Sequence, residues 1–483
     1  MKPHIQATAL ACTASLLLAA CSNSPGLPDA RTSPPARAWL APDEQPASQA
    51  QTAAVMQAGD WWTTFRCATL DHWMSEADNH NADLETARQR LAEARHALAA
   101  QRGGLLPQVS LDAMAGRQKY GAALFGPAQF TIPPFSWYEA GPAIAWTPDF
   151  SGAIHQAIAR RQALAEYQAR NLDALRLEIQ ASIALTALDY AAGLDALAAA
   201  QQQADTDRDT VALVHQTRAA GEATRQETLD AEAQWTHDRE RIPGLQQQVA
   251  SSRHLLAILL GKPPAAWQPP RLSLNDFSLP ESPPVSLPSQ LAQQRPDILV
   301  AAANLHAAAA EAGMAKAAMY PQVTLSANWM QEALSPAGLF NLANDAWAIA
   351  AGISAPLFDG GALREHHRAA EHAWQAARSQ YRQTVLQAFG QIADALTALD
   401  HDRQTLALAD DEVRNAAAGL ELTQTRQHAG TVARPELLHA QHAVAQAQLQ
   451  LTQARMQQAQ DYVRLAVALG GTAAAPNRVS AQR

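Results

Sequence analysis

Apolar residues recur at helical spacing over two very long stretches of the chain. They lie three, four or seven residues apart, the period of helices that pack as coiled coils. The positions are Leu172, Leu175, Ile179, Ile183, Tyr190, Leu194 and Leu197 in the first stretch, and Ile392, Leu396, Leu399, Leu406, Val413 and Leu420 in the second. A helix over residues 153–216 measures about 95 Å at roughly 1.5 Å per residue. The pattern therefore predicts rods that can bridge compartments, although an ordinary structural coiled coil fits these helices alone equally well.

A pattern with a period of two marks four shorter stretches. Residues 323–329 and 347–357 alternate apolar side chains with small or polar ones, which predicts strands with one oily face. Residues 109–115 alternate in the same way, and the return strand near residues 137–146 is less regular because of Pro142. Strands of about ten residues with tryptophan at their ends suit a membrane barrel. A soluble β-sandwich accounts for the alternation as well.

These elements occur twice, because the chain contains an internal duplication. Each copy predicts a short Ala-rich helix, two strands joined by a loop, a very long helix, a turn with glycine, and another long helix. The landmarks Asp83, Leu91, Pro107, Gly152, Gly221 and Gly261 recur as Asp297, Leu305, Pro321, Gly360, Gly430 and Gly470. The offset between the copies changes only between elements, as loop insertions produce.

The segments before and between the two copies differ from them in amino-acid composition. A Pro-, Ala-, Ser- and Gln-rich stretch without periodicity predicts an extended tether, and a second proline-rich stretch cannot form a continuous helix. We predict a signal peptide over 1–20, a lipidated N-terminal tether over 21–60, a first structural repeat over 61–261, a linker over 262–296, a second structural repeat over 297–471 and a flexible tail over 472–483.

The N-terminus has the features of a secretory signal. Lys2 precedes an apolar stretch, residues 10–20, that is too short to span a bilayer and ends in small residues. The sequence Leu18-Ala19-Ala20-Cys21 resembles the bacterial lipoprotein box, which implies cleavage before Cys21 and acylation of Cys21, palmitate included. Ser22 resembles the residue that directs lipoproteins to the outer membrane. An ordinary signal peptide followed by a chance cysteine is the alternative.

The net charge and the cysteine content argue against several classes of function and structure. The net charge of −9, with 36 basic against 45 acidic residues, leaves no basic patch and argues against nucleic acid as a partner. Cys12 leaves with the signal and Cys21 is lipidated, so Cys67 has no partner for a disulfide and is expected to be a small packed residue. No run of eighteen apolar residues follows the signal, which favours crossing a membrane by strands.

The chain carries no pattern that predicts catalysis. GxSxG, HExxH and the nucleotide-binding pattern GxxxxGK[ST] are all missing from the sequence, so we expect neither an enzyme nor a cofactor. His366, His367 and His372 share one predicted helix, and His439 and His442 share another, but no cysteine or carboxylate cluster completes a zinc motif. We interpret these histidines as solvated helix faces, although metal efflux makes the pair His439 and His442 slightly more interesting.

Several short motifs, weak alone but specific in this order around a duplication, carry a family resemblance. They are the lipobox at Cys21, Gly59-Asp60-Trp61-Trp62, Leu287-Pro288-Ser289 with Arg295-Pro296-Asp297-Ile298, Ala317-Ala318-Met319-Tyr320-Pro321 and Pro356-Leu357-Phe358-Asp359-Gly360-Gly361. The chain resembles the TolC-type outer-membrane factors, specifically their NodT-like lipoprotein branch. The resemblance implies an α+β membrane protein: a homotrimer in which each chain gives four strands to a twelve-stranded outer-membrane barrel, continued by a long coiled-coil periplasmic tunnel. Two hairpins cannot close a barrel alone, because lipid does not tolerate open strand edges.

This architecture predicts a passive exit duct for small molecules or drugs in the outer membrane. A barrel of about twelve strands is wider than the eight-stranded kind that its own side chains fill. Without a nucleotide-binding motif the energy has to come from a partner. The resemblance implies a periplasmic adaptor and an inner-membrane efflux transporter, commonly of the resistance-nodulation-division type. The alternative is a periplasm-spanning structural lipoprotein without a pore.

The resemblance also implies where the periplasmic entrance closes. Family members carry acidic residues six and nine positions after the turn glycine, which correspond here to Glu436 and His439 in the second copy and to Glu227 and Asp230 in the first. His439 departs from the usual Asp, which puts a doubly acidic ring in doubt. Local structure offers another role, since Thr224 and Glu227 fit a capping box and Glu436 falls in a first helical turn.

Overall fold

The computed structural model describes residues 60–120, 133–278, 295–432 and 434–471. The predicted signal peptide, Cys21, most of the tether and the predicted tail lie outside the described residues, as does part of the linker. The described chain forms two compact units. The strand unit contains residues 90–168 and 300–381, and the helical unit contains the rest; their borders fall inside helices α3, α4, α7 and α8.

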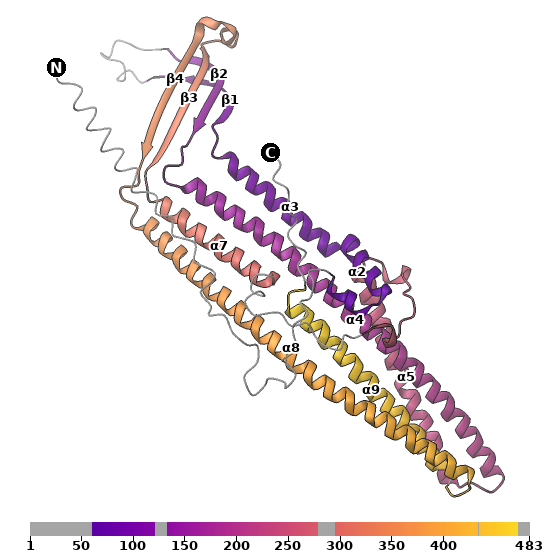
Figure 1. The fold of residues 1–483 in the computed structure, drawn as a ribbon. Coiled ribbons are helices and arrows are strands. Elements are labelled where there is room, and N and C mark those ends of the chain that lie inside the picture. Colours follow the sequence, from indigo (N-terminus) through magenta and orange to yellow (C-terminus); the bar gives the residue numbers. More distant parts are fainter. Residues whose placement is uncertain (1–59, 121–132, 279–294, 433, 472–483) are drawn as a thin grey trace. The chain divides into compact units, whose positions relative to one another are not determined.

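The two halves of the described chain share one series of elements, a short helix, two strands and two long helices, and in the first half η2 and α2 precede this series (Figure 1). Helices α3 and α7 both have 22 residues, α4 and α8 both have 67, and α5 and α9 both have 35. The first half comprises η2 (Trp61–Phe65), α2 (Ala68–His80), α3 (Ala82–Gly103), β1 (Gln108–Gln118), β2 (Phe135–Trp146), α4 (Ala153–Ala219) and α5 (Arg225–Leu259). The second comprises α7 (Pro296–Ala317), β3 (Gln322–Ala333), β4 (Asp345–Ser354), α8 (Ala362–His428) and α9 (Arg434–Ala468), with short 3-10 turns η4 (Pro264–Ala266), η5 (Leu274–Asp276), η6 (Pro336–Phe340) and η7 (Leu342–Asn344) between elements.

The long helices and the strands that the sequence predicts are therefore confirmed. The helix expected over 153–216 is α4, which continues to Ala219. The last predicted strand is shorter than expected, because β4 ends at Ser354 rather than at Leu357.

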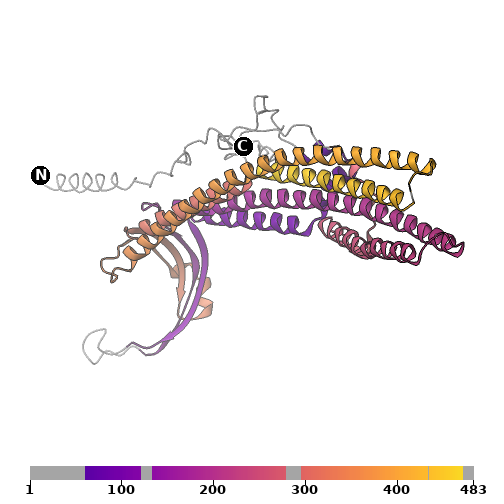
Figure 2. The same cartoon turned by 90° about the horizontal axis from the view of Figure 1, so that it is seen from below.

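The strand unit contains a single antiparallel sheet in the order β1-β2-β3-β4. Figure 2 shows that this sheet is strongly curved. Below it in the same unit, an ion pair between Arg160 and Glu311 joins the first turns of α4 to α7. Gly313 on α7 lies so close to α4 that an added Cβ would come within 2.6 Å of the Gln156 side chain. The short helix of the second half is thus held against the long helix of the first.

A cluster of aromatic side chains forms part of the core of the helical unit. Phe65 is fully buried and contacts Trp61, Phe277 and Tyr462 edge to face, with ring centroids 5.6–6.4 Å apart. Edge-to-face contacts of this kind add to the burial of apolar area. Cys67 lies beside this cluster as a buried free thiol, as the sequence predicts, and burial raises the pKa of the thiol.

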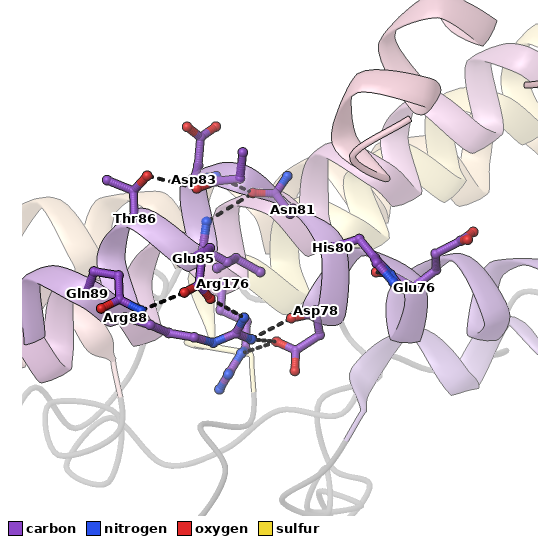
Figure 3. A network of polar contacts seen from close by, with 12 residues as sticks. Glu76, Asp78, His80, Asn81, Asp83, Glu85, Thr86, Arg88, Gln89 and Arg176 are labelled. Carbon is purple, nitrogen blue, oxygen red and sulfur yellow. Dashed lines mark hydrogen bonds and ion pairs between the residues drawn. The ribbon is translucent and has the colours of Figure 1, made fainter. Parts of the chain in front are cut away.

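A polar network ties α2, α3 and α4 together in the helical unit (Figure 3). The Oδ1 atom of Asp78 lies 2.8 Å from Arg176 Nε and 3.3 Å from an Arg88 guanidinium nitrogen. Lys262, just after α5, pairs with Glu76 at 2.5 Å. The three elements therefore share charges as well as apolar contacts.

The end of each second long helix is bound to the start of the short helix of the same half. Asn81, before α3, donates to the carbonyl of Leu259 at 2.9 Å and caps α3 by accepting from Leu84 N at 3.0 Å. Arg295, before α7, donates to the carbonyl of Ala468 at 2.6 Å. The two contacts occupy corresponding positions of the duplication. This explains why a polar residue begins each short helix.

Candidate functional site

The register of the sheet separates an oily face from a small and polar one. Residues directly opposite each other in paired strands point to the same face. One such row is Val109, Ile144, Ala327 and Ile349, and the neighbouring row is Ser110, Ala143, Asn328 and Ala348. Large side chains of the oily face stay exposed, with Leu111 at 80% and Ile349 at 77%. A soluble sandwich would bury this face under a second sheet, whereas all four strands that the structure describes belong to one sheet.

Both outer strands of this sheet have an open edge. Over the described residues β1 pairs only with β2, and β4 pairs only with β3. An oily sheet with open edges is unstable in lipid, because unpaired backbone groups cannot find water there. Further strands therefore have to come from other copies of the chain.

Two helices also pass for membrane spans by length and composition alone. They are α4 and α7, and the apolar windows that qualify them are 50% and 39% buried inside the structure. Packed core helices meet the same criterion, so this finding does not favour helices over strands as the element that crosses the membrane.

Two equivalent turns close the long helical hairpins at one end of the helical unit (Figures 1 and 2). Gly221 after α4 and Gly430 after α8 have φ values of 83° and 68°. Only glycine adopts this conformation freely, and it lets the next N–H bond back to the helix. Accordingly Glu222 N donates to Thr217 O and Thr431 N donates to Arg426 O, both at 2.9 Å.

The first-copy entrance candidates have local partners. Glu227 forms the predicted capping box with Thr224: its carboxylate accepts from the Thr224 backbone at 2.6 Å, and Glu227 N donates to the Thr224 hydroxyl at 3.2 Å. The backbone N–H of Thr224, together with the hydroxyl, lowers the pKa of Glu227. Asp230 accepts from Gln226 at 2.8 Å. Both acidic residues are exposed.

The second-copy candidates lie at the start of α9. Glu436 is in the first turn of the helix, and His439 follows three residues later on the same face. Both side chains are exposed. Glu436 and His439 therefore form an exposed pair close to the turn at Gly430.

His442, one turn further along α9, is not the solvated residue that the sequence predicts. Only 28% of its side chain is exposed, and its Nε2 lies 3.6 Å from Asp207 Oδ1. Its Nδ1 lies 4.0 Å from Asp238 Oδ2. His366 and His372 on α8 are exposed as predicted. His367 faces Glu371 one turn away, at 3.4 Å.

The carboxyl pair beside His442 escaped sequence analysis. Asp207 on α4 and Asp238 on α5 are both buried. Burial and the neighbouring Asp238 carboxyl raise the pKa of Asp207 to about 7, against a hydrogen bond from Gln203 that lowers it. One sequence feature could have revealed the pair: each aspartate follows a glutamine by four residues on the same helix. Gln203 donates to Asp207, and Gln234 donates to Asp238.

A second carboxyl pair lies between α8 and α9. Burial, followed by the hydrogen bond and charge of Asp461, raises the pKa of Asp402 to about 6, and Arg464 and His401 oppose the shift. Gln457 donates to Asp461 at 2.8 Å, again from four residues earlier. Buried carboxyl groups thus occur at two places in the helical unit.

Comparisons of the sequence place the chain among known proteins. The profile of the family described as outer membrane efflux protein matches residues 73–262 and 287–471. The pyoverdine export outer membrane protein OpmQ of Pseudomonas putida is 30% identical over 95% of this chain and 96% of its own length. Nodulation protein T of Rhizobium leguminosarum is 25% identical over 89% of this chain and 88% of its own length.

Comparisons of the structure agree with those of the sequence. The outer-membrane channel OprN superposes with a TM-score of 0.82 and 26% identity, over 92% of this chain and 98% of that one. The outer membrane protein VceC of Vibrio cholerae superposes with a TM-score of 0.76 and 26% identity, over 85% and 98%. The predicted fold class, that of a trimeric outer-membrane channel with four strands per chain and long tunnel helices, is confirmed by these likenesses.

Proposed function

The chain belongs to the outer membrane efflux protein family, and from this premise we propose that it serves as a passive exit duct driven by an inner-membrane transporter through a periplasmic adaptor. It is an efflux channel subunit of the outer membrane, in a family of channels rather than of enzymes. The main support for a duct is the sheet. One of its faces has exposed apolar side chains, and the other has small and polar side chains. Rolled into a barrel, such a sheet presents its oily face to lipid and its polar face to water.

Ion conductance tests the duct against the structural lipoprotein without a pore. The purified trimer, added to a planar lipid bilayer, is expected to produce stepwise conductance that protein-free detergent does not produce. A tether has no water-filled passage, so a membrane-inserted protein that conducts no ions rules out the duct.

Three chains are needed because the strand edges of one chain are open. The outer edges of β1 and β4 supply the backbone groups that a neighbouring copy pairs with. Mass measurement of the detergent-extracted protein is expected to give three chains. A stable monomer inserted in the membrane contradicts the proposal.

A lipid on Cys21 anchors the chain at the inner surface of the outer membrane. The support is the lipobox sequence, because Cys21 lies outside the described residues. In Cys21→Ser, acyl labelling is expected to be lost while the trimer still forms, since the strands have their own affinity for the membrane. Equal labelling of wild type and variant contradicts the anchor.

Glu436 and His439 line the periplasmic entrance, with Glu227 and Asp230 as the first-copy candidates. The support is their exposure next to the turns of the helical hairpins. Glu227 is the weaker candidate, because its carboxylate already caps α5. In a trimer, three Glu436 carboxylates form a negative ring that favours cations, and His439 stands where the family usually has a second acidic residue.

Single-channel recordings test this entrance. His439→Asp adds a carboxylate per chain to the entrance and is expected to strengthen cation preference. His428→Asp is the matched control, because His428 is exposed at the end of α8, on the other side of the same turn; it is expected to change cation preference less. Equal cation preference in wild type and His439→Asp excludes His439 from the entrance.

The cargo is a small molecule. Relatives of similar identity are named for pyoverdine export and, in Pseudomonas putida, for toluene efflux at 27% identity. A deletion strain, tested for sensitivity to iron chelators, solvents and drugs with and without a plasmid copy of the chain, identifies the class. Unchanged sensitivity to every class, with no change in secretion, contradicts an efflux role.

A further inference from the structure

One cluster of metal-binding side chains lies outside the sheet and the entrance. Asp207 on α4, Asp238 on α5 and His442 on α9 each offer one ligand atom, and the three atoms lie within 4.8 Å of one another. The cluster therefore joins three helices of the helical unit. All three residues are separate from the entrance candidates, and His442 is one helical turn from the exposed His439.

Two glutamines orient the carboxylates from one turn earlier on the same helices. Gln203 Nε2 donates to Asp207 Oδ1 and Gln234 Nε2 donates to Asp238 Oδ2, both at 3.0 Å. Gln203 also approaches His442 Nε2 at 3.4 Å. Ligand side chains of metal sites are held by outer hydrogen bonds of this kind.

Among the described residues, the remaining oxygen of Asp207 has no nitrogen or hydroxyl donor. Asp207 is 5% exposed, and its Oδ2 is fully buried. Its carboxyl lies against that of Asp238. A buried acceptor without a donor is costly, so a free carboxylate oxygen next to a second carboxyl points to a bound positive charge.

No guanidinium or ammonium group supplies that charge. Within the parts of the chain that the structure describes, neither Asp207 nor Asp238 forms an ion pair with Arg or Lys, and His442 is their only basic neighbour in an ion pair. Buried carboxylates in contact need a cation, a proton or a hydrogen-bond donor between them.

The spacing suits a small divalent cation. Bonds of about 2.1 Å to nitrogen and oxygen in tetrahedral geometry place two ligand atoms roughly 3.4 Å apart. The distance from His442 Nε2 to Asp207 Oδ1 is 3.6 Å, and Asp238 also has a ligand atom within 4.8 Å of the others, so small side-chain movements bring all three to the ion. One imidazole with two carboxylates is a donor set for divalent transition metals rather than for Ca²⁺, which takes six to eight oxygens.

We propose that Asp207, Asp238 and His442 bind a divalent transition-metal ion, with Zn²⁺ as the representative, and that the ion clamps α4, α5 and α9 together. A water molecule completes the coordination. The ion is a structural component of the helical unit and is distinct from any exported cargo, because both carboxylate ligands are buried between helices.

Metal binding is measured on the full-length trimer, purified without a polyhistidine tag and stripped with a chelator. Titration with Zn²⁺ is expected to show one saturable site per chain that is lost in His442→Ala and in Asp207→Asn. His439→Ala is the matched control, since it removes a histidine from an exposed position of the same helix, and it is expected to keep the site. Far-UV circular dichroism establishes that each variant is folded.

Two further readouts distinguish a site from surface binding. Co²⁺ in place of Zn²⁺ is expected to give visible absorption bands of low coordination number in wild type and His439→Ala, but not in His442→Ala. Zn²⁺ is expected to raise the thermal midpoint of the same two proteins. The proposal is overturned if wild type and folded His442→Ala bind the same amount of Zn²⁺, or if neither binds it; in that case the carboxyl pair is held by a shared proton.

Discussion

Replacing Arg295 by alanine tests how the second half of the chain is closed. Arg295 is 6% exposed, and its guanidinium donates to the carbonyl of Ala468 at 2.6 Å and to Gln391 Oε1 at 2.7 Å. It also forms a two-point contact with Asp297 at 2.8 and 3.0 Å. One side chain therefore connects the start of α7 to the end of α9 and to the middle of α8.

The expected cost follows from what the substitution leaves behind. Hydrogen bonds to charged groups contribute about 1.5–3 kcal/mol each, and a buried acceptor without a donor costs about 1–3 kcal/mol. Asp297 is 44% exposed and regains water, so its contact adds little. Gln391 is exposed and likewise regains water. The carbonyl of Ala468 does not, because Ala468 is 5% exposed, so we expect Arg295→Ala to destabilise the helical unit by about 1.5–3 kcal/mol.

The loss of stability is measured by unfolding the detergent-solubilised protein in guanidinium chloride and following its far-UV circular dichroism. Arg295→Lys retains one donor and is expected to fall between wild type and Arg295→Ala. Arg414→Ala is the control, because the Arg414 side chain is 71% exposed and pairs with Asp411 on the surface; it is expected to change stability by less than about 1 kcal/mol. If Arg295→Ala and Arg414→Ala unfold at the same denaturant concentration, the contact from Arg295 to Ala468 does not stabilise the packing of α9.

Further predictions concern the other half, the second carboxyl pair and the sheet. Asn81→Ala removes the corresponding contact at the end of α5 and a helix cap, and is expected to cost about 1–3 kcal/mol in the same unfolding assay; an unchanged midpoint contradicts this. The pKa of Asp402 is raised from 3.8 to about 6, so the folded state holds a proton that the unfolded state releases, and stability is expected to fall as the pH rises from about 4 to above 6. In Asp402→Asn this slope is expected to flatten, and an equal slope excludes the pair with Asp461 as its source. Ile349→Lys puts a charge on the oily face and is expected to cost about 2–4 kcal/mol near the bilayer centre and to reduce the assembled trimer in heat-modifiability gels. Ala350→Lys, on the opposite face, is expected to assemble normally and to change only ion selectivity; equal assembly of both variants means that the faces are assigned wrongly.

The elements of this protein are visible in the sequence because they depend on local patterns. A period of two predicts the strands, a coiled-coil period predicts the 67-residue helices, and the repeated landmarks predict two equivalent halves. The capping box of Thr224 and Glu227 spans four residues and is confirmed for the same reason. Gly221 and Gly430 mark the hairpin turns because no other residue adopts their φ values freely.

Contacts between segments that are far apart in the sequence could be identified only from the tertiary structure. Arg295 was visible as part of a motif, but its bond to a carbonyl 173 residues away was not. His442 looked like a solvated histidine because the sequence shows only its own helix; Asp207 and Asp238 reach it from two other helices. A helical period predicts that a residue faces a seam, whereas the partner across the seam depends on how three helices align along their axes, and that alignment is decided only when they pack.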